Sequence, residues 1–166
     1  MSEDLKVSKL QKIHKQVLDL GLHIQTHDFD RPWGGFLVID PVDTKKFILQ
    51  FYPELADELT ATTLPLSPKI LCVAPEQRLS WQYHHRRSEL WKLIEGKAAY
   101  KKSDTDQEGD INIMELNKTL TLRQGERHRL IGLNEWGIIA EIWQHTDAND
   151  PSNEDDIIRL QDDFGR

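Results

Sequence analysis

The stretch "LSWQYHHRRSELW", residues 79–91, alternates bulky and polar side chains in the manner of a β-strand. Trp81 and Tyr83 share one face of that strand. Gln82 and His84 share the other face, because successive side chains on a strand point to opposite sides. In a small barrel an inward polar face lines a ligand cavity, but on a surface strand it meets water. The stretch therefore predicts either a metal site inside a barrel or a solvated strand rich in His and Arg.

Most of the remaining chain continues this strand pattern. Ten short segments rich in β-branched and aromatic residues are separated by clusters of Gly, Pro, Asp and Asn. Many short strands without intervening helices predict an all-β sandwich or barrel rather than a βαβ sheet. The predicted strands are GFLVID (35–40), KKFILQFY (45–52), KILCVAP (69–75), RLSWQYHH (78–85), LWKLIEG (90–96), AAYKKS (98–103), INIMEL (111–116), TLTL (119–122), HRLIGL (128–133) and GIIAEIWQH (137–145).

The N-terminal residues show a helical period instead. Apolar residues recur there at steps of three and four, which predicts a helix over residues 4–20 that ends at Gly21. The chain of 166 residues fits one domain, which we divide into a helical extension, 1–30, and a barrel with a C-terminal tail, 31–166. The apolar stripe of the helix consists of Leu10, Ile13, Val17 and Leu20.

Composition narrows the classes of partner and compartment. The chain has 21 basic and 28 acidic residues, a net charge of −7, which argues against binding to nucleic acid or to anionic membranes. Cys72 is the only cysteine and lies in an apolar run, so we expect a buried thiol and a reducing compartment. The N-terminal residues lack the features of a signal peptide, and no stretch reaches the roughly 18 apolar residues of a membrane span. These features predict a cytoplasmic protein.

Four polar residues could form a metal site. Gln82 and His84 would stand side by side on the inward face, and Glu89 follows across a turn. His128 opens an apolar strand after a Gly-containing turn, which makes it the best candidate for a fourth ligand. One amide, two imidazoles and one carboxylate suit Zn²⁺, Fe²⁺, Ni²⁺ or Mn²⁺. Spacing alone, however, favours an ordinary solvated strand over a metal site.

Two segments resemble the paired motifs of the cupin superfamily. The first is QYHHRRSELWKLIEG, residues 82–96, in which Gln stands in place of the first His of the motif. The second is GERH, residues 125–128. The resemblance implies an all-β cupin fold, a double-stranded β-helix or jelly-roll barrel, with an N-terminal α-helix added and a metal ion inside. The ligand positions that it implies are Gln82, His84, Glu89 and His128.

Three stretches also resemble type II mannose-6-phosphate isomerases, a family within the cupins. They are LSWQYHHRRSELW (79–91), RPWGG (31–35) and EDDIIRLQDDFGR (154–166). The resemblance implies a metal-dependent aldose–ketose isomerase that converts mannose 6-phosphate to fructose 6-phosphate, or acts on a related sugar or sugar phosphate. The implied cofactor is a divalent metal ion, Zn²⁺ first, with Fe, Ni, Mn or Co as alternatives. Many cupins pair through their sheets, so we expect a homodimer.

Four positions depart from the pattern of that family. They are Arg86 and Leu90, which stand where the family has histidines, Glu76, which replaces a Gly, and Arg123, which replaces a Pro. If a missing histidine were the base of the isomerisation, catalysis would be lost while the metal site survived. The alternatives are therefore a non-catalytic sugar-binding or regulatory cupin, or another cupin enzyme such as an epimerase or an oxygenase.

Chemistry on a sugar phosphate requires a base and cationic groups in addition to the metal. Arg87 matches an Arg of the family, and we take it and His85 as candidate catalytic residues, although strand alternation turns His85 away from His84. A phosphate group is best held by Arg or Lys near the mouth of the cavity. The candidate substrate-binding residues are Arg86, Lys69, Arg127 and Arg129, followed by Arg159 and Arg166. Aromatic residues expected in the core are Trp91, Trp136 and Trp143.

Overall fold

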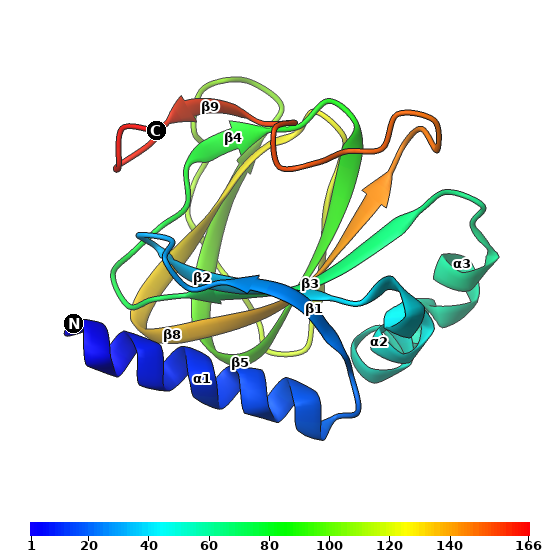
Figure 1. The fold of residues 1–166 in the computed structure, drawn as a ribbon. Coiled ribbons are helices and arrows are strands. Elements are labelled where there is room, and N and C mark those ends of the chain that lie inside the picture. Colours follow the sequence, from blue (N-terminus) through cyan, green and yellow to red (C-terminus); the bar gives the residue numbers. More distant parts are fainter.

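Two long antiparallel strands, β5 (Arg87–Ser103) and β8 (Arg127–His145), run through the centre of the computed structural model, which describes all 166 residues (Figure 1). Their register is interrupted twice beside the pair formed by Gly96 and Gly137, and such bulges bend a strand. Gly96 has a φ of 77°, and a Cβ there would lie 1.8 Å from the carbonyl oxygen of Trp136. Only glycine fits at this bend.

The other strands attach on both sides of this central pair. Along one path the order is β1-β2-β3-β8-β4-β9, and β5 also pairs with β6 and β7. All these pairings are antiparallel, and the sheet does not close on itself. The arrangement is the expected double-stranded β-helix. The remaining strands are β1 (Ile24–Asp28), β2 (Gly34–Ile39), β3 (Leu66–Val73), β4 (Trp81–Tyr83), β6 (Asn112–Ile113), β7 (Thr119–Leu122) and β9 (Ile158–Gln161).

Helices cover the outer side of the sheet, at the bottom and right of the view in Figure 1. The first helix begins at Ser2, whose Oγ accepts a hydrogen bond from the backbone N–H of Leu5. The others lie between β2 and β3 in the chain, together with two 3-10 turns. No helix is long and apolar enough to cross a membrane. The bounds are α1 (Glu3–Asp19), η1 (Pro41–Asp43), α2 (Thr44–Phe51), η2 (Pro53–Leu55) and α3 (Ala56–Ala61).

The hydrophobic core has two parts on opposite faces of the sheet, because side chains alternate along each strand. We call them the helix-side core and the interior core. Burial on the helix side raises the pKa of the Cys72 thiol to about 12, which confirms its expected role as a small apolar residue. The helix-side core contains Leu10, Ile13, Val17, Leu22, Leu37, Ile39, Phe47, Ile48, Phe51, Tyr52, Leu59, Ile70, Cys72, Leu90, Ile138, Ala140 and Ile142. The interior core contains Trp33, Phe36, Leu71, Val73, Leu79, Trp91, Leu93, Ala98, Met114, Leu122, Leu130 and Ile139.

One predicted strand is wrong. KKFILQFY, residues 45–52, forms α2, because Phe47, Ile48 and Phe51 are buried together at helical spacing. The helix predicted over 4–20 is confirmed, although the last residue of its apolar stripe, Leu20, is 43% exposed and lies outside the core.

Other differences concern where elements begin and end. The segments predicted at 90–96 and 98–103 join in β5, and those at 128–133 and 137–145 join in β8, because the glycines between them bend the strands without ending them. The helix α3 and the strands β1 and β9 are additional to the prediction. Since β1 pairs with β2, the sheet starts within the stretch that we expected to be a helical extension.

Candidate metal centre

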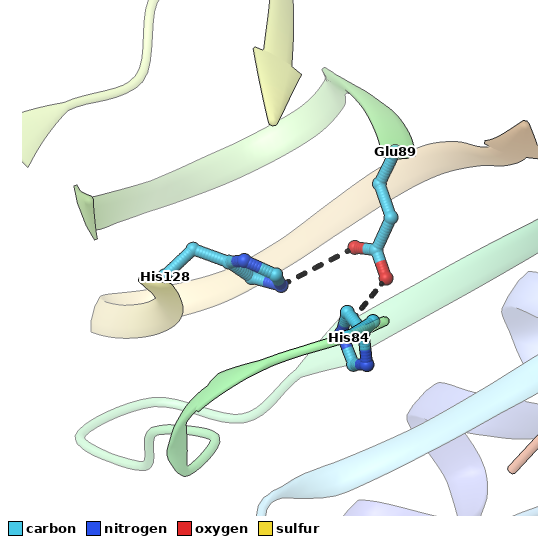
Figure 2. A group of neighbouring side chains, drawn as sticks. All are labelled: His84, Glu89 and His128. Carbon is cyan, nitrogen blue, oxygen red and sulfur yellow. Dashed lines mark ion pairs between the residues drawn. The ribbon is translucent and has the colours of Figure 1, made fainter. Parts of the chain in front are cut away.

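Three buried side chains from separate strand segments converge inside the barrel (Figure 2). His84 follows β4, Glu89 lies on β5 and His128 lies on β8. His84 Nε2 lies 3.2 Å from Glu89 Oε1, and His128 Nε2 lies 3.5 Å from Glu89 Oε2. Each of the three residues is only 2% exposed, and their potential ligand atoms all lie within 4.8 Å of one another. The group could therefore hold a metal ion.

Backbone carbonyls fix the orientation of both imidazoles. Nδ1 of His84 lies 2.7 Å from the carbonyl oxygen of Asp156, and Nδ1 of His128 lies 2.9 Å from that of Glu126. Because a carbonyl oxygen can only accept, each Nδ1 carries a proton, and each Nε2, the other ring nitrogen, faces Glu89. Metal-binding histidines are commonly oriented in this way by their second nitrogen.

The unpaired atoms of the cluster match the needs of a divalent cation. Glu89 Oε2 and His128 Nε2 are buried and have no hydrogen-bond partner, which is costly unless another group binds them. Burial, as the main cause, lowers the pKa of His128 to about 4, so its imidazole is neutral near pH 7. Burial alone would raise the pKa of Glu89, but the positive charge of Arg87, followed by the interaction with His84, holds it well below its usual range. A carboxylate and two imidazoles form a donor set that Zn²⁺ and similar ions accept.

Gln82 lies beside this cluster, as the strand alternation predicts. It is buried and pairs with His128 across β4 and β8. Its amide oxygen accepts a hydrogen bond from Ser80 at 2.5 Å, and its amide nitrogen lies 3.4 Å from His84 Nε2. Rotation of the amide would bring the oxygen to the cluster instead, so Gln82 could serve as the fourth ligand.

Arg87 is buried against the same cluster. Its Nε donates to Glu89 Oε1 at 2.8 Å and its Nη2 donates to His84 Nε2 at 3.2 Å. The guanidinium also stacks on the ring of Trp143, 3.6 Å from its centre. A metal ion on His84 Nε2 would displace the guanidinium from that nitrogen, whereas Glu89 could keep Arg87 on one oxygen and offer the other to the metal.

A loop near the C-terminus, residues 147–156, supports the site, and sequence reasoning did not assign it this role. The carboxylate of Asp156 accepts hydrogen bonds from the backbone N–H groups of His85 and Arg86, at 2.9 and 3.0 Å, and from the Ser152 hydroxyl. Burial alone would raise the pKa of Asp156, but these hydrogen bonds outweigh it and lower the pKa. The Ser152 hydroxyl also accepts from Arg87. Asp156 therefore holds the turn that presents His84.

A cavity of about 80 Å³ opens beside the cluster. It shares Phe36, Lys69, Trp143 and Glu154 with an open groove of about 800 Å³. Sequence reasoning placed Trp91 and Trp143 in the core, and both are buried, but they also line this cavity. The residues around the cavity are Arg31, Trp33, Phe36, Lys69, Leu71, Leu79, Gln82, Arg87, Glu89, Trp91, Glu141, Trp143, Glu154, Ile157, Arg159 and Arg166.

Glu141 is a second buried carboxyl group in the cavity wall, and sequence reasoning missed it. Its oxygens accept hydrogen bonds from the indole N–H groups of Trp91, at 2.7 Å, and Trp143, at 3.0 Å. Burial, followed by the negative charge of Glu89, raises the pKa of Glu141 to about 8. The only available signal was one charged residue inside an otherwise apolar strand, GIIAEIW.

Cationic side chains gather at the edge of the cavity. Lys69, Arg159 and Arg166 were expected near the substrate, and all three line the cavity together with Arg31. Lys69 pairs with Glu154 at 2.5 Å, while Arg31 and Arg166 pair with aspartates of their own segments at 2.9 Å. Arg159 makes no ion pair, and its pKa is lowered by burial and then by the nearby positive charge of Arg166. The edge of the cavity therefore suits an anion.

Four of the predicted catalytic and substrate-binding residues lie outside the cavity. His85 is exposed and packs edge-on against Tyr83, because alternation turns it away from the cluster. Arg86 lies 3.8 Å from Asp150 on the outer loop. Arg127 stacks on the Tyr83 ring and pairs with Asp106. Arg129 is buried and binds Glu108, Gln161 and the Leu79 carbonyl oxygen, so its donors are already occupied.

Comparison with known sequences gives one family. The family model described as mannose-6-phosphate isomerase C-terminal matches residues 62–162. Mannose-1-phosphate guanylyltransferase of Escherichia coli (strain K12) is 25% identical over 162 residues, 96% of this chain and 28% of that protein. Xanthan biosynthesis protein XanB of Xanthomonas campestris pv. campestris (strain B100) is 30% identical over 98 residues, 59% of this chain and 19% of that protein. The chain thus spans less than a third of the length of these curated relatives.

Comparison with solved structures supports the fold. Vicilin from tomato, Solanum lycopersicum, has a TM-score of 0.54 at 13% identity, over 84% of this chain and 35% of that chain. A variant of oxalate decarboxylase from Bacillus subtilis has a TM-score of 0.56 at 12% identity, over 81% of this chain and 30% of that chain. At such low identity these likenesses establish the barrel architecture alone.

Proposed function

Because the chain belongs to the mannose-6-phosphate isomerase C-terminal family, a cupin-type family, we propose that it is a metal-dependent aldose–ketose isomerase. The first substrate to test is mannose 6-phosphate, with fructose 6-phosphate as the product. The observation that carries the proposal is the buried cluster of His84, Glu89 and His128 inside the matched segment, next to a cavity with a cationic edge. A related sugar phosphate would fit the same reasoning.

The proposed metal ligands are His84, Glu89, His128 and Gln82. Zn²⁺ is the first choice for this mixed nitrogen and oxygen set, with Fe, Ni, Mn or Co as alternatives. When bound, a divalent ion would supply Lewis-acid stabilisation of the negative charge that develops on the sugar oxygens. Arg87 adds a positive charge at the same place, since its guanidinium already contacts Glu89 and His84. Trp91 and Trp143 are buried in the wall of the same cavity, where their indole rings would keep water away from the bound sugar.

The phosphate group would lie at the cationic edge. Arg159 has no competing ion pair, and Arg31 and Arg166 are close enough to lower its pKa, so an anion would relieve their mutual repulsion. Lys69 would join them if its ion pair with Glu154 opened. That opening would also connect the small cavity to the adjoining groove, giving the space that a sugar phosphate needs. Ligand pockets usually enclose roughly 300–1,000 Å³.

Two departures from the family pattern have less bearing on catalysis than the sequence suggests. Leu90 points into the helix-side core and Arg86 lies on the outer loop, so neither lines the cavity. A histidine at either position would need a different backbone course to reach a sugar in the cavity. The substitutions are therefore compatible with a working isomerase.

A second candidate is a non-catalytic sugar-binding or regulatory domain. The observation that favours it is the guanidinium of Arg87, which bridges His84 and Glu89 where a metal ion would bind, beside a cavity of only about 80 Å³. Other cupin chemistry, such as epimerisation or oxygenation, would use the same ligands on a different substrate. Metal content and turnover separate these possibilities.

The test is an isomerase assay on chelator-treated protein to which Zn²⁺, Co²⁺ or Mn²⁺ is added back. We expect conversion of mannose 6-phosphate with at least one metal, and none in the His84→Ala variant. His14→Ala, which changes a histidine on α1 that is not part of the cluster, is the matched control and should keep full activity. Thermal stabilisation by sugar phosphates without turnover under any metal would establish the binding domain instead.

A further inference from the structure

The proposed isomerase needs a group that moves a proton between two carbon atoms, and the cavity wall contains one carboxyl group with no other assigned role. We infer that Glu141 is this group: it takes the proton from C2 of the aldose and returns it to C1. The inference rests on the proposed function. It concerns a residue outside the metal cluster and replaces His85, which faces solvent, as the candidate base.

The position of Glu141 follows from strand register. Residue 141 on β8 lies opposite Trp91 on β5, and its side chain points into the interior, where it is 4% exposed. It lines the cavity with Gln82 and Glu89, so a sugar whose oxygens reach the metal cluster would also lie beside Glu141. A base must be within hydrogen-bond reach of the proton that it removes, and a position in the wall of the same cavity is what that requirement asks of Glu141.

The hydrogen bonds of Glu141 differ from those of the other carboxyl groups that line the cavity. Glu89 pairs with Arg87, and Glu154 pairs with Lys69. Glu141 makes no ion pair and receives only the two neutral indole donors, one on each oxygen. The indoles fix the direction of the carboxyl group and leave each oxygen a second lone pair for a substrate proton.

Electrostatics agree with this geometry. Burial and the charge of Glu89 favour the protonated form, whereas Lys69, Arg87 and the Trp91 indole favour the ionised form. The resulting pKa of about 8 lies within about one unit of neutral pH, so the carboxyl group is mostly protonated there and its ionised form is readily accessible. A group that must both accept and return a proton works best under that condition.

The reaction balances without an oxidant or a co-reactant. The carboxylate of Glu141 takes the C2 proton, the C2–H electron pair forms the C1–C2 double bond, and the C1–O1 π pair moves onto O1. A proton then passes from the O2 hydroxyl to O1, which gives the enediolate with its charge on O2. As the C2–O2 double bond forms, the C1–C2 pair takes the proton from Glu141 at C1. The product ketose has the same atoms as the aldose, and Glu141 ends as the carboxylate.

The experiment compares the metal-loaded wild type with Glu141→Gln and with the control Glu95→Gln. Glu95 is a β5 glutamate that pairs with Lys9 of α1, outside the cavity. Turnover and the incorporation of deuterium from D₂O into the sugar carbons are followed by NMR. Metal content is measured by elemental analysis. Affinity is measured by calorimetry with 1,5-anhydromannitol 6-phosphate, which has no carbonyl group to isomerise.

We expect Glu141→Gln to lower kcat by about 10² to 10⁴-fold and to lower deuterium incorporation in parallel. Metal content and affinity for the anhydro sugar should stay close to the wild-type values, and Glu95→Gln should match the wild type throughout. If the Gln variant does not fold, Glu141→Asp keeps a carboxylate but withdraws it by one methylene. It should then fold and show a kcat at least about tenfold lower.

Four results would overturn the inference. Turnover by Glu141→Gln within tenfold of an active wild type would remove Glu141 as the proton-transfer group and leave the proposed function intact; wild-type turnover by Glu141→Asp would do the same. Loss of metal or of anhydro-sugar binding along with turnover would assign Glu141 a structural role. An inactive wild type that carries its metal would overturn both the proposed function and the inference.

Discussion

The two faces of β5 differ in chemistry although their residues alternate along one strand. Glu89 and Trp91 point inward to the cavity, whereas Leu90, between them, is buried in the helix-side core. β8 repeats the contrast, with Glu141 facing inward and Ile142 facing the helices. Adjacent positions in the sequence can therefore have unrelated roles. A substitution on the helix-side face should therefore affect stability alone, whereas one on the inward face should affect metal binding and activity as well.

The largest expected effect comes from Glu89→Ala on the inward face. Loss of the carboxylate removes the central ligand of the cluster, so we expect no bound metal and isomerase activity at background. It also leaves Arg87 buried without its partner, which should lower the free energy of unfolding by roughly 3–5 kcal/mol. Metal analysis, the isomerase assay and urea unfolding measure the three consequences. Full metal occupancy in this variant would show that Glu89 is not a ligand.

Leu90→His tests the opposite face and restores the residue type of the family. The imidazole would enter the apolar helix-side core, where Leu90 is 3% exposed, so we expect a loss of about 2–4 kcal/mol in the free energy of unfolding. The kcat of the folded fraction should not change. Chemical denaturation and the isomerase assay on the same preparation give both numbers. A rise in kcat would mean that position 90 reaches the substrate.

Stability should depend on pH through Glu141 on the inward face of the strands, and not through the apolar residues of the helix-side face. Burial raises the pKa of Glu141 to about 8 from 4.5, so between these values the folded metal-free protein holds a proton that the unfolded chain releases. Its stability should fall as the pH rises through this range, and Glu141→Gln should remove that fall. Relative to the wild type, the variant should gain on the order of a few kcal/mol between pH 5 and pH 9.

Leu90→Ala is the control for that measurement. It changes the apolar face only, so its loss of stability should be the same at pH 5 and pH 9. A pH-independent difference between wild type and Glu141→Gln would show that Glu141 keeps an ordinary pKa.

Asp156→Ala should have a moderate effect, because Asp156 acts on the metal site through the turn that presents His84. Loss of such a support commonly weakens metal binding by about 10–100-fold. Titration against a chelator measures the change. Asp155→Ala, at the exposed neighbouring position, is the control and should bind metal like the wild type. Equal affinity in both variants would make the loop dispensable for the site.

Strand alternation was sufficient to place part of the site correctly. It predicted that Gln82 and His84 share one face and that His85 does not, because the period of a strand is independent of the rest of the fold. Alternation did not decide whether that face is buried, and spacing alone favoured a solvated face, whereas both residues are buried. Glu89 and His128 were candidates from their places after turns, and the motif resemblance implied the same two positions. Local pattern could not show that they meet, since strand pairing brings them together from distant positions. The error at 45–52 has a physical origin, because a short apolar run fits a buried strand or a buried helix equally well.

Glu141 and Asp156 could not be found in this way. Glu141 is one acid in an apolar strand, and its environment depends on Trp91, fifty positions away in the sequence. Asp156 lies in an acidic, polar loop that has the composition of a solvated turn. It is nevertheless buried, and it accepts a hydrogen bond from the turn that it supports. Properties that depend on which distant segment packs against a residue cannot be derived from local pattern.

The smallest effects should come from Arg86→His and His85→Ala, which change the outer side of the same turn. Arg86 makes only a long contact of 3.8 Å to Asp150, and His85 is exposed, so stability should change by less than about 0.5 kcal/mol. We expect kcat to stay within about twofold of the wild type, because neither side chain lines the cavity. Steady-state kinetics on mannose 6-phosphate measures both variants. A tenfold gain in Arg86→His would show that the family histidine acts inside the cavity, and the division of this segment into a catalytic and a supporting face would fail at that position.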